Sequence, residues 1–488
     1  MGSYRMPNLT RTVDSGEWIY YDTEEGLFIC DYRGKEKNVV MPAFIDGKPV
    51  KAVLSTGNYL FYKWGVFFKK GVESVVISEG ISAIEFNAFT LGDLTSVRIP
   101  SSVTRIEESA FDGNKLTDVT IPEQVTYIGS YAFSGNKLAC VAIPPGVQTI
   151  GSWAFSSNCL TRAVIPPGVR DIGEWAFSYN RLADIAIPDS VTTIGNCAFM
   201  RNELTGIDLP ASVTGIGGRA FAENRLTSVF IPRTLVSIGG GAFANNPALA
   251  AIVTDSENPS YTSVEGVLFS KDKTTLVSYP AGKGTVYAIP DGVTAIASFA
   301  CGHSQLEQVI LPASVTVIGF AAFSDNHLTS ITIPPGVTTI ADFAFSRNEL
   351  SCIIIGMDVE FRPDGADDDF SSVYKGGGKK AGKYTKTNGV WNYAPLDKEL
   401  ALRYFDFKKA AGAWAKKAVF EIKTMTFHLM LIGFIPLAFP VLPKFLTRIV
   451  VYVFQFVFYV FFFIPCLCVL LGRRAIKKLR NKSKDEEG

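Results

Sequence analysis

The stretch Asn114-Lys-Leu-Thr-Asp-Val-Thr-Ile-Pro122 belongs to a 22-residue unit that recurs between Asp93 and Ile355. The unit continues through Val125, Ile128-Gly129 and Ala132-Phe133. A constant period over this many copies predicts a solenoid, in which each coil packs on its neighbours. The residue before the repeated proline marks the period: Ile99, Ile121, Ile143, Ile165, Ile187, Leu209 and Ile231, then Ile289, Leu311 and Ile333.

Each unit divides into a strand and a return segment. The segment Leu-Thr-x-Val-x-Ile alternates apolar and variable residues, which predicts a short strand with one buried face. Pro122 would end it, because proline has no N–H for a ladder. From Val125 to Phe133 the apolar residues lie three or four apart, which predicts a tight helical turn. The expected fold class is therefore a β-rich repeat solenoid with one short strand and one tight helical turn per coil.

A glycine and an asparagine repeat in phase with these segments. Gly129 and its equivalents would give the return segment a close corner. An asparagine stands three residues after each phenylalanine, and we expect these side chains to bond the backbone of neighbouring coils. They are Asn114, Asn136, Asn158, Asn180, Asn202 and Asn224.

The repeated unit resembles the BspA-like bacterial leucine-rich repeat, whose signature is Asn-x-Leu-Thr-x-Val-x-Ile-Pro followed by Val, Ile-Gly and Ala-Phe. The resemblance covers roughly residues 16–395. It implies a leucine-rich-repeat solenoid and, as one functional alternative, a bacterial surface adhesin that binds matrix protein or glycan.

Breaks in the repeat suggest the domain organisation. Between Ile231 and Ile289 the register is lost for 58 residues, and two strand-like runs there flank a polar turn, which predicts a β-hairpin island. Asn388-Gly389 predicts a second hairpin. The expected segments are a polar N-terminus (1–15), an N-terminal cap (16–70), repeats (71–250), the island (251–288), repeats (289–356), a C-terminal cap hairpin (357–395), a connecting or interfacial helix (396–424), a transmembrane hairpin (425–471) and a basic tail (472–488).

The C-terminal region predicts a membrane anchor. Ile449–Leu471 is 23 residues long and almost wholly apolar, enough for one helix to cross a bilayer. Residues 425–442 either span as well or form a re-entrant wedge, because Pro436 and Pro440 interrupt them. Seven basic residues follow these segments, five precede them and two lie between them, which favours two cytoplasmic ends. Residues 1–15 carry no apolar signal core. We therefore expect cytoplasmic repeats, with the cell surface as the alternative.

The remaining composition offers little chemistry. A net charge of +1 does not favour nucleic acid, and the eight cysteines show neither metal-ligand spacing nor a disulfide framework. Residues 377–383 have the spacing of a phosphate loop, but Tyr384 replaces the required Ser or Thr, so a basic turn is expected. Asp364 and residues 367–369 form an acidic loop that binds calcium weakly or is simply solvated. We predict no catalytic site, no cofactor and no metal.

Variable positions of the strand predict where a partner binds. The outward column between the Val and the Ile is short of charge and places apolar residues in the exposed phase, as a protein-binding face would. The alternative is that these residues only satisfy sheet propensity. With a spacing of about 4.8 Å, the column is expected to form a continuous stripe. Its members are Thr120, Ala142, Val164, Ala186, Asp208, Phe230, Ile310 and Thr332.

A second candidate surface is aromatic. Tyr131, Trp153 and Trp175 occupy the same phase of three successive coils. They either grip a sugar or a partner loop, or pack between adjacent turns. The leading hypothesis is a membrane-anchored, non-enzymatic scaffold that binds an unidentified protein through the strand face.

Overall fold

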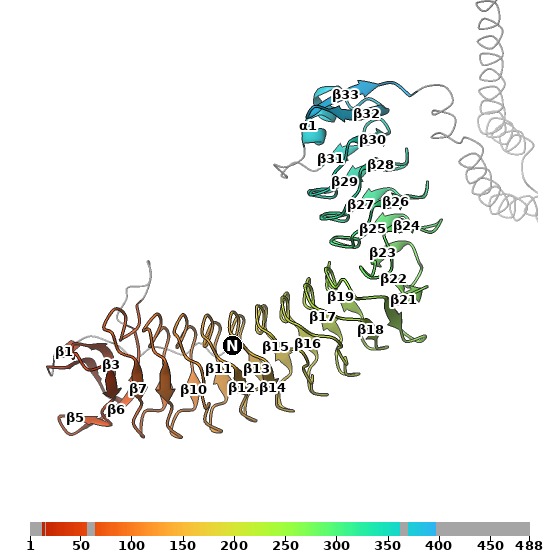
Figure 1. Cartoon of the computed structure of the whole chain (residues 1–488). Helices are drawn as coiled ribbons and strands as arrows, with labels where there is room; N and C mark the ends of the chain where they lie inside the picture. The colour runs from red at the N-terminus through yellow and green to blue at the C-terminus, as the bar shows by residue number, and fades with distance from the viewer. Residues whose placement is uncertain (1–11, 15, 56–63, 362–368, 397–488) are drawn as a thin grey trace, which may run out of the picture. The chain divides into compact units, whose positions relative to one another are not determined.

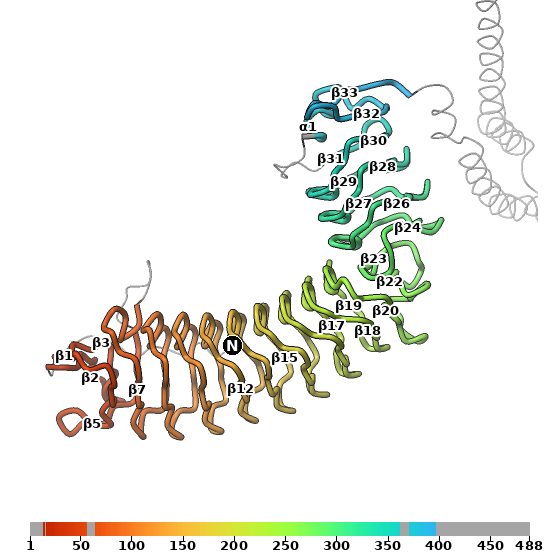
Figure 2. The backbone as a smooth tube through the Cα atoms, viewed as in Figure 1, coloured from red at the N-terminus to blue at the C-terminus, as the bar shows by residue number. Residues whose placement is uncertain are grey.

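The computed structural model describes residues 12–14, 16–55, 64–361 and 369–396. They belong to one compact unit, Met1–Tyr404. Figure 1 shows coils that follow one another side by side, and Figure 2 traces the same path as a tube. The predicted membrane hairpin and basic tail lie outside the described residues. Within the described part of the chain, no helix has the length and hydropathy needed to span a bilayer.

A long sheet runs through the first array, and most of its strands come from the return segments. These strands are parallel and two residues long, as where Arg105 and Ile106 lie beside Tyr127 and Ile128. The strands of this sheet are β1 (Thr12–Asp14), β2 (Trp18–Thr23), β3 (Gly26–Tyr32), β5 (Phe44–Ile45), β6 (Lys48–Val53), β8 (Ala83–Ile84), β10 (Arg105–Ile106), β11 (Tyr127–Ile128), β13 (Thr149–Ile150), β15 (Asp171–Ile172), β16 (Thr193–Ile194), β17 (Gly215–Ile216) and β19 (Ser237–Ile238).

The second array has a sheet of the same kind. It starts with three antiparallel strands and continues with parallel pairs. Its strands are β21 (Tyr261–Val264), β22 (Val267–Ser270), β23 (Thr275–Ser278), β25 (Ala295–Ile296), β27 (Val317–Ile318), β29 (Thr339–Ile340) and β31 (Glu360–Phe361).

The predicted helical turn of the return segment is wrong. After its two-residue strand, each return segment makes successive tight turns: the Ala132 N–H donates to the Gly129 carbonyl at 3.3 Å, and Tyr131 between them has a φ of 59°. A helix requires φ near −63° at every residue, so a left-handed residue in each coil excludes it. The turns bring apolar residues inward at a spacing that a helix would share. Among the described residues, the one helix is α1 (Asp369–Gly376).

The predicted strand of the unit forms, but not in every coil. At Ile185 the side chain of Asp184 accepts the backbone N–H at 2.8 Å, which removes a donor from the ladder. The strands that do form lie in short sheets: β4 (Asn38–Val40), β7 (Ser74–Val76) and β9 (Ser96–Arg98); β12 (Cys140–Ala142) and β14 (Arg162–Val164); β18 (Ser228–Ile231) and β20 (Ala251–Thr254); β24 (Val286–Ala288) and β26 (Gln308–Ile310); β28 (Ser330–Thr332), β30 (Cys352–Ile355), β32 (Gly382–Thr387) and β33 (Val390–Ala394).

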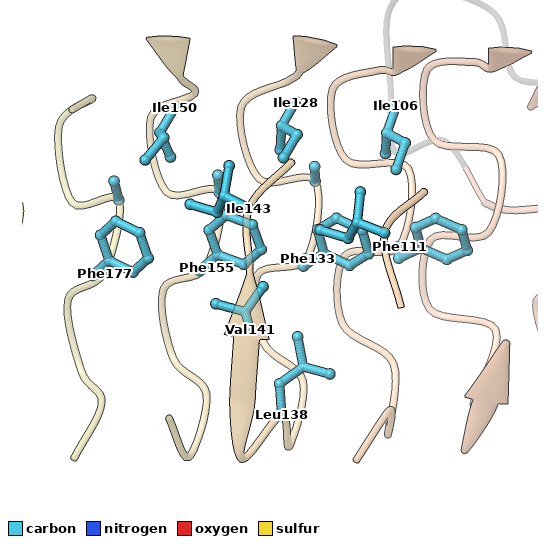
Figure 3. Close-up of a cluster of buried hydrophobic side chains, with 14 of the residues drawn as sticks. Ile106, Phe111, Ile128, Phe133, Leu138, Val141, Ile143, Ile150, Phe155 and Phe177 are labelled. Carbon is cyan, nitrogen blue, oxygen red and sulfur yellow. The ribbon is translucent and has the colours of Figure 1, made fainter. Parts of the chain in front are cut away.

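A ladder of phenylalanine rings fills the core of the first array. Figure 3 shows Phe111, Phe133, Phe155 and Phe177 in a row, one from each coil. From Phe89 to Phe221, successive ring centroids lie 5.2–5.5 Å apart and the rings are within 14° of parallel. Each ring therefore covers the face of the next, and a coil buries its core only between two neighbours.

The predicted asparagine ladder is confirmed. Asn158 Nδ2 donates to the carbonyl of Phe133 in the preceding coil at 2.9 Å and to that of Phe155 at 3.2 Å, while its Oδ1 accepts the Leu138 N–H at 3.0 Å. The predicted close corner is confirmed as well, since a Cβ on Gly129 would lie 2.5 Å from the Glu108 nitrogen. The same side-chain bonds recur at Asn114, Asn136, Asn180, Asn202, Asn224, Asn246, Asn326 and Asn348.

The predicted island hairpin is present and joins the two arrays. β22 pairs antiparallel with β23, and β21 adds a third strand. Leu268 packs in the core of the first array, whereas its neighbours Val267 and Phe269 pack in the core of the second. The island therefore belongs to both cores.

The last coil is covered by the predicted C-terminal hairpin. β32 and β33 pair antiparallel around Asn388 and Gly389, both with positive φ, and β32 pairs with β30. The helix α1, which the sequence reasoning missed, buries Phe370 and Tyr374 beneath this hairpin. The four-residue spacing of Phe370 and Tyr374 was the available signal.

Candidate interaction surfaces

The structure places all eight residues of the predicted strand face on the surface. The large apolar ones are well exposed, with relative exposures of 44% for Val164 and 52% for both Phe230 and Ile310. Their backbones alternate with buried core positions, such as Ile231 beside Phe230. These side chains therefore remain available to a partner.

The predicted continuous stripe is broken into patches. Ala142 lies beside Val164 in the pair β12–β14, and Thr332 lies beside Ile354 in β28–β30. Ala186 and Asp208 lie in coils whose outward segment is not a strand, and Phe230 and Ile310 belong to different sheets. In the coil of Ala186, the side chain of Asp184 competes with the ladder by accepting the Ile185 N–H.

Val253 is a member of the face that sequence reasoning missed. It is exposed and lies directly beside Phe230 in the parallel pair β18–β20. Val253 follows Phe230 by 23 positions rather than 22, so counting in steps of 22 from Phe230 does not reach Val253. The pairing of Phe230 with Val253 makes this end of the first array the most apolar part of the face.

The three aromatic residues predicted as a patch are brought together. Tyr131 and Trp153 stack at 5.6 Å with 6° between their planes, and Trp153 and Trp175 stack at 4.5 Å with 10°. A ring held between two others needs about 7 Å, two contacts of about 3.5 Å each. The stack therefore leaves no room for a sugar between its rings, and the geometry favours the packing interpretation over the grip on a sugar.

The aromatic stack continues farther than sequence reasoning found. Tyr179 stacks on Trp175 at 6.1 Å, and the Arg201 guanidinium lies 4.9 Å from the Tyr179 ring. Glu223 pairs with Arg201 and also with Arg219. Arg219 in turn lies over Phe299 of the second array at 5.2 Å. Rings and charges thus connect the two arrays along their turns. Trp175, Arg219 and Phe299 occupy the same left-handed position as Tyr131. Tyr179, Arg201 and Glu223 occupy a second one, two residues after a core phenylalanine.

Titratable groups at this junction are perturbed by burial. Burial lowers the pKa of His303, against the opposing effect of Asp325, whose carboxylate lies 3.4 Å from His303 Nε2. Elsewhere in the first array, burial raises the pKa of the Cys197 thiol to about 11, and in β3 of the N-terminal cap it raises that of Cys30 to about 12. Such thiols stay protonated at neutral pH and are poor nucleophiles. The six cysteines that the structure describes are free.

The sites considered for ions and phosphates do not come together in the described residues. Residues 377–381 follow α1 and precede β32, so this basic turn leads from a helix to a strand, the reverse of a phosphate loop. In the acidic loop, residues 364, 367 and 368 lie outside the described residues. Within the part of the chain that the structure describes, no group of three or more His, Cys, Asp or Glu side chains is placed to hold a metal.

The repeats match a known family profile. The profile described as BspA type leucine rich repeat region (6 copies) matches residues 62–183, 170–289 and 294–366. It covers nearly all of both arrays and the island between them. No curated protein matches the chain.

Several solved structures are similar to this chain. A leucine rich cell surface protein from Faecalibacterium prausnitzii is 24% identical, with 70% of this chain and 88% of that chain covered and a TM-score of 0.42. A leucine-rich repeat protein from Bacteroides ovatus is 20% identical, with 74% and 90% covered and a TM-score of 0.45. The pneumococcal vaccine antigen PcpA is 18% identical, with 72% and 82% covered and a TM-score of 0.36.

Proposed function

The chain belongs to the BspA-type leucine-rich repeat family, and from that premise we propose that it is a non-enzymatic, membrane-anchored scaffold that binds another protein through its strand face. The observation that carries this proposal is the exposure of Val164, Phe230 and Val253 on the first array of coils and of Ile310 on the second. Large apolar side chains in the exposed phase of a strand cost solubility unless a partner covers them.

The composition around these residues also suits a protein partner. The strand has a second outward column, at the position before Val119 and its equivalents. Asp118, Arg162, Asp184 and Gln308 occupy it and are exposed. An apolar centre with a polar rim is the common arrangement of protein interfaces. The alternative, that these residues serve only sheet propensity, predicts that charges at the same positions leave binding unchanged.

A pair of lysine substitutions tests the face. We expect Phe230→Lys and Val164→Lys to weaken capture of the partner about 30-fold or more, since a central apolar contact is worth about 2 kcal/mol or more. The partner would first be found by proximity labelling, and binding then measured with purified components. Gln148→Lys is the matched control, because Gln148 is exposed but lies outside the strand face. Unchanged binding by folded Phe230→Lys protein would reject this face.

The location of the repeats is a separate part of the proposal. The basic residues that flank the segment 425–471 favour repeats inside the cell, with this segment as the anchor. Protease added to intact cells should therefore leave the repeats uncut until the cells are lysed. Digestion without lysis would contradict this location and favour the surface adhesin that binds matrix protein or glycan.

A further inference from the structure

The end of the second array contains a cavity that the proposed strand face does not use. It lies between the last coil and the C-terminal cap and has a volume of about 120 Å³. Most of its lining residues are apolar, among them Phe345, Leu350 and Ile353 of the last coil and Phe361 and Trp391 of the cap, and polar groups of Ser346, Arg347, Asn348 and Lys386 complete the wall. A cavity of about 150 Å³ lined by similar residues holds benzene, so the space suits one aromatic ring.

The cavity lies where the phenylalanine ladder stops. Phe345 stacks on Phe323 at 5.4 Å with 4° between the planes. Among the described residues no ring stacks on its other face, and Phe345 is only half-buried, unlike the interior ladder rings. The next aromatic side chains, Phe370 and Trp391, meet edge to face at 5.1 Å and do not continue the stack. The wall thus offers the open face of one phenylalanine to another ring.

One buried nitrogen in the cavity wall has no hydrogen-bond acceptor. The Nε1–H of Trp391 is buried and has no hydrogen-bond partner. Leaving such a donor unpaired destabilises the fold, whereas an oxygen atom in the cavity would satisfy it. The lining also includes Lys386 and Arg347, and the Lys386 ammonium lies 5.7 Å from the centre of the Trp391 ring. Arg347 is paired with Asp325 at 3.2 Å, so Lys386 is the cation of the lining that lies beside Trp391.

We propose that this cavity binds an aromatic carboxylate. The ring stacks on Phe345 as the next member of the ladder, and a carboxylate oxygen accepts the hydrogen bond from Trp391 Nε1 beside Lys386. Two kinds of molecule contain an aromatic ring close to a carboxylate: a small free aromatic acid, and a polypeptide that ends in phenylalanine.

The indole N–H of Trp391 provides the readout. With the whole chain in detergent and its tryptophans labelled with ¹⁵N, titration with 3-phenylpropionate should shift one indole resonance and raise the melting temperature. That resonance is assigned by its loss in Trp391→Phe. The neutral analogue 3-phenylpropanol should bind about tenfold more weakly, because it lacks the charge that pairs with Lys386. No shift at millimolar 3-phenylpropionate would overturn the proposal.

Three variants test the parts of the site. Leu350→Phe should abolish binding by filling the cavity, and Trp391→Phe should weaken it about tenfold by removing the donor. Lys386→Gln should weaken binding of the acid and leave that of 3-phenylpropanol unchanged. Lys383→Gln is the control, because Lys383 belongs to the same strand but does not line the cavity. Equal binding by wild type and by Leu350→Phe protein with an unchanged thermal transition would also overturn the proposal.

Peptides separate the two sources. A short peptide ending in phenylalanine should compete with 3-phenylpropionate if the cavity takes polypeptide ends, and its C-terminal amide should not. Binding of the small acid without competition by the peptide assigns the cavity to free aromatic acids. Tight binding of the amide would contradict the carboxylate in either case. None of these results depends on the strand face, so the two proposals fail separately.

Discussion

The two arrays end differently. At the end of the first array, Phe243 is buried and the Ile238 N–H, at the edge of the long sheet, donates to the Tyr261 hydroxyl at 2.9 Å. At the end of the second array, Phe345 remains half-buried and lines a cavity. The first end is closed by the island, which has a coil stack on each side. The second end is closed by a hairpin and one helix, which leave a cavity of about 120 Å³ beside Phe345.

Strand β22 explains why the island closes both neighbours. Successive side chains of a strand point to opposite faces, so Leu268 enters the first core while Val267 and Phe269 enter the second. A hairpin in this place ends one sheet and starts the next, since β23 pairs in parallel with β25. We infer that the long break in the repeat is an internal cap rather than an accidental insertion.

The largest expected effect comes from truncating the two faces of β22. Leu268→Ala should destabilise the first array and Phe269→Ala the second, each by about 3–5 kcal/mol, because each removes a fully packed side chain. Hydrogen exchange would locate the loss by residue. Equal loss of protection in both arrays from either variant would contradict the division of the island between two cores.

A somewhat smaller effect is expected from the asparagine that holds the island. Asn258 is fully buried, donates to the carbonyls of Pro232 and Leu235, and accepts the N–H groups of Ser260 and Tyr261. Asn258→Ala leaves buried backbone groups unpaired and should cost about 2–4 kcal/mol in urea unfolding.

Asn392→Ala is the matched control for this experiment. Asn392 lies in the exposed outer strand of the C-terminal hairpin, where Nδ2 makes one bond of 3.2 Å to the Val390 carbonyl. It should change stability by less than about 0.5 kcal/mol, as exposed substitutions usually do. If Asn392→Ala destabilised the protein as much as Asn258→Ala, the island would not be held more strongly by its asparagine than the C-terminal hairpin is.

The features that recur in every coil could be predicted from the sequence. The period gave the solenoid, and the asparagines and glycines behave as predicted because every coil places them in the same environment. The helical turn was wrong because tight turns with a left-handed residue, such as Tyr131, share the helical spacing of apolar residues. The continuity of the strand face depended on single non-repeating residues such as Asp184. The aromatic connection to Phe299 crosses the island, and no local pattern reports a contact at that separation.

A third prediction concerns the hydroxyl that covers the edge of the first array. Tyr261→Phe removes the acceptor of the Ile238 N–H and should cost about 1 kcal/mol, the usual net value of one hydrogen bond. The ring itself stays, so packing is preserved. Exchange of the Ile238 amide should rise more than that of its neighbours. Unaltered exchange there would show that the hydroxyl does not close this edge.

The smallest effect is a pH dependence at the first coil after the island. Burial lowers the pKa of His303 below 6.5, although Asp325 opposes this, and Glu223, Arg219 and Arg347 also act on the ring. Below about pH 6.5 the unfolded chain therefore binds more protons than the folded one, so stability falls as the pH decreases and levels off below the folded pKa. Thermal unfolding between about pH 7.5 and about pH 5.5 should show this loss, and His303→Gln should reduce it. If wild type and His303→Gln lost the same stability between these pH values, the pH dependence would come from other groups. The contact of His303 with Asp325 beside the island would then not contribute to it.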